Sequence, residues 1–305
     1  MLVDLVQVTT RDGVKLDGMY QAASAPSTLP IDAFCLVHGT GGSFYSSTLF
    51  DAIGERLLAL GSSVLRLNTR GHDLMSTAVT SKGGRRVGAA YEVVDDCRHD
   101  LTAWVDWLKQ RAGPRIGLIG HSLGAVKCIY ALAHEPLEVG ALIAISPPRL
   151  SYSWFCTSPE GPAFLETYAE AERFVAQGEP AKLLEVKLPL PFVVTAAGYA
   201  EKYGPDERYN YLRFLGGVRG PLLLTLGAVE MANNMAFRAA DAAVAEAGRK
   251  HPALAVAVID GADHFYTGVR PALISRIESW LGTLPITAQT STSTPPPTSA
   301  RFETR

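Results

Sequence analysis

The sequence has few cysteines and no long apolar run. The 305-residue chain contains four cysteines, without the paired spacing of a metal site or the pattern of a disulfide framework: Cys35, Cys97, Cys128 and Cys156. No apolar stretch approaches the ~20 residues that a membrane span needs, and the first residues lack the basic and apolar regions of a secretory signal. These absences predict a soluble, cytoplasmic protein with no membrane span.

The sequence also lacks an excess of charge of one sign. It has 28 Lys and Arg against 30 Asp and Glu, a formal net charge of −2, and no basic run long enough to suggest a nucleic-acid partner. The composition, 47% hydrophobic and 19% charged, is ordinary for a globular protein, and the length fits one large domain or two smaller ones. We therefore expect no nucleic-acid binding.

The most informative stretch is Gly120-His121-Ser122-Leu123-Gly124. An apolar run at 115–119 precedes it and reads as a buried strand, and residues 125–132 follow it as a helix. A Gly-x-Ser-x-Gly between a strand and a helix is the signature of a nucleophile elbow, whereas the same five residues elsewhere can be an ordinary loop. The glycines leave room for a tight turn that presents Ser122 at the helix N-terminus, where the helix dipole favours developing negative charge.

Strands and helices alternate on both sides of this motif. A hairpin is expected from two alternating runs around an Asp-Gly pair, and helices are expected where apolar residues recur every three or four positions. The expected strands are 3–10, 14–21, 31–37, 63–67, 137–145, 221–227 and 253–259, the expected helices include 46–60, 92–111 and 233–249, and 76–90 is expected to be an exposed loop. This order predicts an α/β fold with a mostly parallel central sheet and helices on both faces.

The alternation stops after residue 149 and resumes at 218. Residues 150–217 are rich in aromatic side chains and helical in pattern, and they are predicted to form a helical cap over the carboxyl edge of the sheet, where open α/β folds bind ligands. Some of these aromatic residues are expected to line a pocket, although such spacing also suits packing helices. Residues 1–149 and 218–283 then form the core, and the Thr-, Ser- and Pro-rich stretch 284–305 is expected to be a disordered tail.

A serine nucleophile needs a base that takes its proton and an acid that orients the base. Of the seven histidines, His264 follows the last expected strand and so lies at the same sheet edge as Ser122. The others are interpreted as structural, because they lie beside turn glycines, in a turn, or on helices and their ends: His38, His121, His72, His99, His134 and His251. His264 is therefore the candidate base.

The candidate acid is Glu230, which follows the strand at 221–227 and lies between Ser122 and His264 in the chain. A glutamate also suits the start of a helix for electrostatic reasons alone. Asp260 and Asp263 are rival candidates, but they are so close to His264 in sequence that they are poorly placed to reach its far ring nitrogen. The order Ser, Glu, His along the chain is that of α/β hydrolases.

A second glycine-rich turn, His38-Gly39-Thr40-Gly41-Gly42-Ser43, follows the strand at 31–37. Such a turn exposes backbone N–H groups that could hold a phosphate or form half of an oxyanion hole. The Gly-x-x-x-x-Gly-Lys-Ser/Thr pattern of phosphate loops is absent from the sequence. The oxyanion hole is therefore the favoured interpretation.

Over residues 1–283 the chain resembles the serine α/β-hydrolase superfamily, and among its members the esterases and lipases with a cap insertion. The marks of the resemblance are His38-Gly39, Arg70-Gly71-His72, the elbow around Ser122, the turn from Gly227 to Glu230, and Gly261-Ala262-Asp263-His264-Phe265. Two features depart from the common pattern: the acid is Glu rather than Asp, and Arg70-Gly71-His72 is preceded by Asn68-Thr69 and followed by Asp73.

The resemblance implies that Ser122 is the nucleophile, His264 the base and Glu230 the acid. It further implies that the backbone N–H groups of Thr40 and Leu123 form the oxyanion hole, and that no cofactor and no metal takes part. The expected reaction is hydrolysis of a small or medium carboxylic ester, a lactone or a thioester through an acyl-enzyme. Acyl transfer or cyclisation, C–C bond hydrolysis and a non-catalytic ligand-binding receptor of the same fold are the alternatives.

Overall fold

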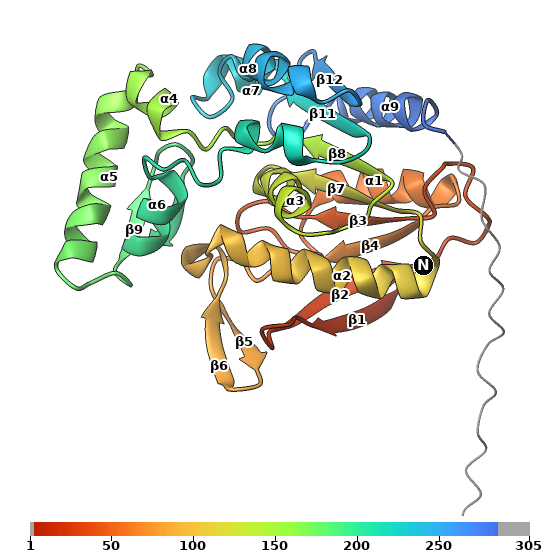
Figure 1. Cartoon of the computed structure of the whole chain (residues 1–305), viewed down its shortest axis with the longest axis horizontal. Coiled ribbons are helices and arrows are strands. Elements are labelled where there is room, and N and C mark those ends of the chain that lie inside the picture. The colour runs from red at the N-terminus through yellow and green to blue at the C-terminus, as the bar shows by residue number, and fades with distance from the viewer. Residues whose placement is uncertain (1–2, 286–305) are drawn as a thin grey trace, which may run out of the picture.

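The computed structural model describes residues 3–285, in which eight strands form one central sheet (Figure 1). The strand order is β1-β2-β4-β3-β7-β8-β11-β12. Their bounds are Asp4–Thr9 for β1, Lys15–Gln21 for β2, Ala33–Val37 for β3, Ser63–Leu67 for β4, Ile116–His121 for β7, Ala141–Ile145 for β8, Leu222–Gly227 for β11 and Leu254–Ile259 for β12. The strands from β4 to β12 in this order are parallel, and β1 and β2 add antiparallel pairs at one edge. The predicted mostly parallel sheet is confirmed.

Helices cover both faces of the sheet, as predicted. On one face, α1 (Thr48–Ala59) and α9 (Arg270–Leu281) pack in a single apolar cluster that includes Ile53 and Ile277. On the other face, α2 (Cys97–Ala112) and α3 (Leu123–His134) belong to a second cluster. Successive strand residues point to opposite faces, so Cys35 lies in the second cluster and its neighbour Leu36 in the first. Burial on both sides explains why these strands read as continuous apolar runs.

The segment 76–90, expected to be an exposed loop, contains a β-hairpin. Strands β5 (Ser76–Thr80) and β6 (Gly83–Val87) pair in antiparallel register, and Figure 1 shows them projecting from the edge of the molecule. Ala78 and Val87 are buried while the residues between them are largely exposed. A bridge between Val14 and Thr80 attaches the hairpin to the turn between β1 and β2. The loop expectation was wrong because polar β-branched residues can form a strand with a single buried position.

The chain between β8 and β11 forms a separate group of elements, which Figure 1 shows beyond the ends of the central strands. It contains α4 (Tyr152–Thr157), α5 (Gly161–Ala176), β9 (Leu183–Val186), β10 (Phe192–Thr195) and α6 (Ala196–Tyr203). The antiparallel pair of β9 and β10 was not expected in this segment. Many of its aromatic residues are buried in the apolar core rather than exposed: Phe155, Phe164, Tyr199, Tyr203, Tyr209 and Tyr211.

Two short helices replace the single helix expected at 233–249. They are α7 (Ala228–Asn233) and α8 (Ala240–Ala247). Short 3₁₀ helices complete the described chain at Ala89–Tyr91, Val94–Asp96, Tyr211–Arg213, Leu215–Gly217 and Gly248–Lys250. None of the helices in residues 3–285 is both long and apolar enough to cross a membrane. Of the expected disordered tail, 284–305, the residues from 286 onward lie outside the described residues.

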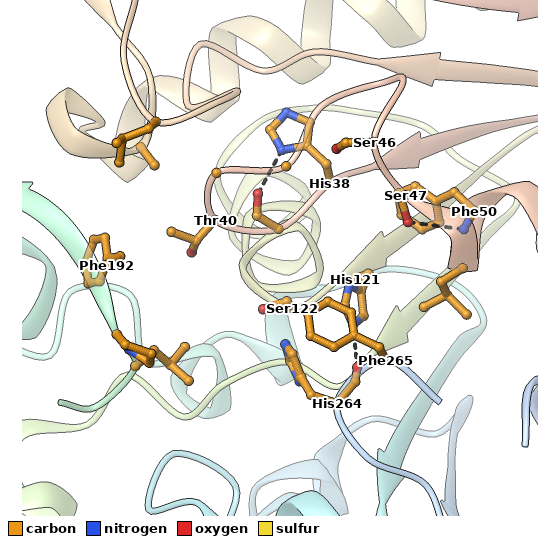
Figure 2. A pocket seen from close by; sticks show the side chains of 18 of the residues that line it. His38, Thr40, Ser46, Ser47, Phe50, His121, Ser122, Phe192, His264 and Phe265 are labelled. Carbon is orange, nitrogen blue, oxygen red and sulfur yellow. Dashed lines mark hydrogen bonds between the residues drawn. The ribbon is translucent and has the colours of Figure 1, made fainter. Parts of the chain in front are cut away.

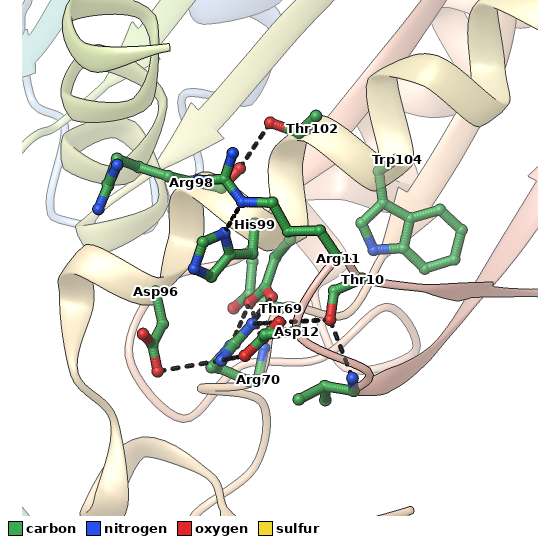
Figure 3. Close-up of polar contacts among 12 residues, drawn as sticks. Thr10, Arg11, Asp12, Thr69, Arg70, Asp96, Arg98, His99, Thr102 and Trp104 are labelled. Carbon is green, nitrogen blue, oxygen red and sulfur yellow. Dashed lines mark hydrogen bonds and ion pairs between the residues drawn. The ribbon is translucent and has the colours of Figure 1, made fainter. Parts of the chain in front are cut away.

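A buried arginine connects the turn between β1 and β2 to the start of α2 (Figure 3). Arg70, just after β4, donates hydrogen bonds to Asp12 in the first hairpin turn and to Asp96 and Asp100 at the start of α2. Arg70 is 3% exposed and the Asp100 side chain is fully buried. Burial opposes ionisation of Asp12, but the hydrogen bonds from Arg70 outweigh it and lower the pKa of that carboxyl. Arg70 of the Arg-Gly-His segment thus ties the first hairpin of the sheet to α2.

Candidate active site

A cavity of about 560 Å³ opens at the carboxyl edge of the parallel strands (Figure 2). Ser122, His264 and Thr40 all line it, whereas Leu123 and Glu230 do not. Its other walls come from α1, the turn after β3, the two sides of the β5–β6 hairpin, the segment before α6, the end of α6 and the loop of His264. The apolar and aromatic residues among them are Leu49, Phe50, Leu74, Ala89, Leu190, Pro191, Phe192, Tyr203 and Phe265. Among the aromatic residues of 150–217, Phe192 and Tyr203 line the cavity. The lining surface is therefore mostly apolar, with hydroxyl and imidazole groups from several segments among it.

Ser122 occupies a sharp turn between β7 and α3. Its backbone has φ 57° and ψ −129°, a strained conformation for a residue with a side chain, and its N–H donates to Ile145 O at 2.9 Å. A Cβ on Gly120 would lie 2.5 Å from Gly124 O, and a Cβ on Gly124 would lie 2.1 Å from Val37 O. Both flanking glycines are thus required by close backbone contacts, and the turn presents the serine hydroxyl to the cavity.

His264 and Glu230 meet through a hydrogen bond. The Nδ1–H of His264 donates to Oε2 of Glu230 at 2.8 Å. The Glu230 side chain is 3% exposed and the His264 side chain 22% exposed. With its Nδ1 proton held by the carboxylate, the imidazole keeps Nε2 free as a proton acceptor on the cavity side, and Figure 2 shows its ring beside Ser122.

The other carboxylate oxygen of Glu230 is held by hydrogen bonds from residues at the ends of β11 and β8. Oε1 accepts the Gly227 N–H at 2.7 Å and a short hydrogen bond from the hydroxyl of Ser146. The Tyr266 hydroxyl lies 3.0 Å from Ser146 Oγ and 3.0 Å from Thr225 Oγ1. Ser146 and Tyr266 both have positive φ, 47° and 55°. Sequence reasoning missed these residues, because a polar residue after one strand, inside another or in a later loop carries no spacing signal.

The rival acids have other contacts. Oδ1 of Asp263 accepts the backbone N–H groups of Phe265 and Thr267, each at 2.9 Å, so it caps its own turn. Asp260 is exposed. Within the part of the chain that the structure describes, neither carboxylate forms a hydrogen bond with His264. The geometry thus brings Glu230, rather than either rival, to the histidine.

His121, next to the elbow serine, supports the loop that carries His264. Its Nε2–H donates to the backbone oxygen of His264 at 2.8 Å, and the two rings lie 4.8 Å apart. Burial, followed by the charge of His264, lowers the pKa of His121 to about 3. His121 is therefore a neutral hydrogen-bond donor at ordinary pH, in line with its interpretation as structural.

The backbone N–H groups of Thr40 and Leu123, beside Ser122, are among those that have no acceptor within residues 3–285. Leu123 begins α3, where the first N–H groups have no intrahelical partner. A Cβ on Gly39 would lie 2.8 Å from Ser122 Cβ, so the turn before Thr40 passes directly over the serine. Free N–H groups on both sides of a nucleophile can stabilise an oxyanion.

The described residues offer no cluster of three His, Cys, Asp or Glu side chains arranged to hold a metal ion. The four cysteines are unpaired thiols, and Cys35 and Cys128 are buried, as their positions in a strand and in the elbow helix predict. The chemistry that the site can support with its own side chains is proton transfer at His264 and nucleophilic attack by Ser122.

Comparison with known proteins places the fold in a family. A sequence model described as the alpha/beta hydrolase family matches residues 36–276. No curated protein shows significant similarity to the chain.

Several solved structures have the same fold over nearly the whole chain. The esterase Pf2001 of Pyrococcus furiosus has 23% identity and a TM-score of 0.60, with 92% of each chain covered. Est1E of Butyrivibrio proteoclasticus, solved with ferulic acid bound, has 17% identity and a TM-score of 0.65, with 92% of this chain and 99% of that chain covered. The mouse alpha/beta hydrolase domain-containing protein 10 has 19% identity and a TM-score of 0.63, with coverage of 92% and 100%.

Proposed function

The chain belongs to the alpha/beta hydrolase family, and from this premise we propose that it is a serine hydrolase that cleaves a small or medium carboxylic ester through an acyl-enzyme on Ser122. The observation that carries the proposal is the bond from His264 Nδ1 to Glu230 Oε2, with the same imidazole lining a cavity next to Ser122. The esterases among the solved structures of this fold agree with ester hydrolysis. Lactones and thioesters are acyl compounds of the same reactivity class.

In the proposed first half-reaction, Ser122 Oγ attacks the carbonyl carbon of the ester while its proton passes to Nε2 of His264. The negative charge on the carbonyl oxygen is stabilised by the N–H groups of Thr40 and Leu123. Glu230 stabilises the imidazolium that forms, and does not itself take the proton. The intermediate then expels the alcohol, which leaves with the proton from His264, and Ser122 carries the acyl group as an ester.

In the second half-reaction, water replaces the alcohol. His264 takes a proton from the water, whose oxygen attacks the acyl carbon and again places negative charge on the oxygen that faces Thr40 and Leu123. Collapse of this intermediate releases the carboxylic acid and returns the proton to Ser122 Oγ. Protons and electron pairs balance over the cycle without a cofactor.

The size of the cavity favours a small or medium substrate. Its volume of about 560 Å³ lies within the range of small-molecule sites, and its walls are mostly apolar. Phe192 and Tyr203, which lie between β8 and β11 in the chain, contribute to these walls. We assign residues 150–217 the role of a cap that selects the acyl group or the alcohol.

The test is a panel of p-nitrophenyl esters from acetate to palmitate, with lactones and thioesters alongside. The wild type should hydrolyse short and medium acyl chains, and Ser122→Ala should lose nearly all of this activity. Ser275→Ala is the matched control, because Ser275 is exposed on α9 and lies outside the cavity. Its activity should equal that of the wild type.

Equal hydrolysis by the wild type and Ser122→Ala would contradict the proposal. An acyl-enzyme that forms but transfers its acyl group to added alcohols or amines in preference to water would instead support acyl transfer. Saturable ligand binding without turnover on any panel member would support a receptor of this fold.

A further inference from the structure

We propose that His38 is a positioning residue for the oxyanion hole, which orients the Gly39–Thr40 peptide and is itself held in one tautomer by Thr69 and Lys127. The inference rests on the proposed function, since it assigns a task to the turn that carries the Thr40 N–H. It also accounts for two parts of the sequence that the reaction does not use directly, His38 in the first glycine-rich turn and Thr69 before Arg70.

Both ring nitrogens of His38 form hydrogen bonds. Its Nε2 accepts the backbone N–H of Thr69 at 3.0 Å and lies 3.2 Å from Thr69 Oγ1. A nitrogen that accepts an N–H carries no proton of its own, so the proton of the neutral ring is on Nδ1. Nδ1 lies 2.8 Å from the carbonyl oxygen of Gly39 and donates to it.

That carbonyl belongs to the same peptide unit as the Thr40 N–H. In a planar trans peptide the C=O and the N–H point in opposite directions, so fixing one fixes the other. The Gly39 carbonyl accepts the His38 ring proton and, at 3.2 Å, the Gly42 N–H. The Thr40 N–H is thereby turned away from both donors and remains without an acceptor among the described residues. Donation to a carbonyl also polarises the N–H of that peptide and strengthens it as a donor.

Lys127 makes the Thr69 oxygen an acceptor and so leaves the hydroxyl proton available to His38. Lys127 Nζ donates to Thr69 Oγ1 at 2.9 Å, and an ammonium has donors only. The Thr69 oxygen therefore acts as acceptor toward Lys127, and its own proton is free to point at His38 Nε2. Burial, and then the charge of Lys127, lower the pKa of His38 to about 3, so the ring stays neutral and keeps this arrangement.

A buried carboxylate holds Lys127 in place. Glu92 Oε1 lies 2.5 Å from Lys127 Nζ, and its side chain is 2% exposed. Burial opposes ionisation of Glu92, but Lys127 and Lys202 outweigh it and lower its pKa. A Cβ on Gly71 would lie 1.8 Å from Glu92 Oε1, so the glycine of the Arg-Gly-His segment makes room for this carboxylate. Lys202 Nζ lies 3.7 Å from Glu92 Oε2, so Glu92 is also paired with a lysine of α6.

Kinetics on a hydrolysed ester test the positioning role. In His38→Leu the Gly39 carbonyl loses its ring donor, and kcat should fall by about 10²-fold, near the lower end of the loss for one oxyanion donor, with KM little changed. His38→Asn is the matched control, because its amide N–H can occupy the place of Nδ1, and it should recover most of kcat. Thr69→Val, which keeps the backbone N–H, should lower kcat less than His38→Leu, and Thr69→Ser should match the wild type. Wild-type kcat in folded His38→Leu would overturn the inference.

The proton position is tested without any substrate. Long-range ¹H–¹⁵N NMR on the full chain with ¹⁵N-labelled histidine, assigned by comparison with His38→Asn, should show the His38 proton on Nδ1. A proton on Nε2 in an active wild type would overturn the inference and leave the proposed function intact. A proton on Nδ1 in a protein that hydrolyses no ester would support the ring assignment and contradict the proposed function.

Discussion

The carboxylate of Glu230 accepts a hydrogen bond from His264 Nδ1 at 2.8 Å, although the two residues are 34 positions apart in the chain. Glu230 lies in the first turn of α7, directly after β11, and His264 follows β12, which is the parallel neighbour of β11 in the sheet. The turns after adjacent parallel strands meet at the same edge, so the pairing follows from topology. The longer glutamate side chain reaches His264 with one oxygen while the other binds the Gly227 N–H at 2.7 Å.

This relationship predicts unequal effects for the two nearby acids. Glu230→Gln keeps the shape but favours the wrong imidazole tautomer, and kcat for ester hydrolysis should fall by up to roughly 10⁴-fold. Asp263→Asn should retain most activity, because Asp263 binds only backbone N–H groups of its own turn. The measurement is steady-state kinetics on one ester with both variants. Similar losses in the two variants would argue against Glu230 as the orienting acid.

Ser146 is predicted to support the acid without touching the substrate. Its hydroxyl donates to Glu230 Oε1 in a buried site, and a hydrogen bond to a charged group contributes about 1.5–3 kcal/mol. Ser146→Ala should therefore lower the free energy of unfolding by that amount and kcat by roughly tenfold, since about 1.4 kcal/mol corresponds to a factor of ten. Urea unfolding and kinetics on the same preparation check this. Unchanged values of both would show that the contact contributes nothing.

The buried His121 predicts a dependence of stability on pH. Its pKa is lowered from 6.5 to about 3 in the folded protein. Between these values the unfolded chain binds a proton that the native state does not, so the free energy of unfolding falls as pH decreases from about 6.5 toward 3. The slope from one such group is at most about 1.4 kcal/mol per pH unit. Urea unfolding at several values between pH 5 and 6.5 measures it.

His121→Gln is the matched variant for this measurement. Its amide can still donate to the His264 carbonyl, as the His121 Nε2–H does, but it does not titrate. The slope should be smaller in the variant, while contributions from other groups are common to both proteins. An identical slope in the variant and the wild type would contradict the neutral state assigned to His121.

The ion pairs of buried Arg70 with Asp12, Asp96 and Asp100 should contribute far more to stability than an exposed ion pair. Arg70→Met leaves the fully buried Asp100 without its cation, and removal of one partner from a buried pair typically costs about 3–5 kcal/mol. Arg249→Ala removes a pair with Glu246 at the surface and should cost under about 1 kcal/mol. Chemical denaturation of both variants tests the contrast. Equal losses would mean that Arg70 does not anchor α2 and the first hairpin.

The parallel sheet could be predicted from sequence because its signals are local. Buried strands read as apolar runs, the strand–turn–helix context of Ser122 is contiguous, and each candidate residue lies within a few residues after a strand. The prediction that Glu230 lies beside His264 required only that neighbouring parallel strands end at the same edge of the sheet. These inferences required only the order of the helices and strands, and they did not depend on how side chains pack.

The remaining features depend on contacts between distant parts of the chain. The strand at 76–80 has one buried side chain, Ala78, and its identity depends on pairing with β6 and on the bridge to Val14. Ser146 follows β8, the other parallel neighbour of β11, but nothing in the sequence shows that its hydroxyl points at Glu230. Lys127 comes to Glu92 through the packing of α3 on the chain before α2. A polar residue in an apolar helix such as α3 gives no sign in sequence of the partner that satisfies it.

The most direct test of the account is labelling with a fluorophosphonate probe, followed by peptide mass spectrometry. An activated serine with a neighbouring base attacks the phosphorus, whereas an ordinary hydroxyl does not. We expect the label on the peptide that contains Ser122, lost in Ser122→Ala and strongly slowed in Glu230→Gln. Folded wild-type protein that takes up no probe, or that is labelled equally in Ser122→Ala, would contradict the assignment of Ser122 as the nucleophile.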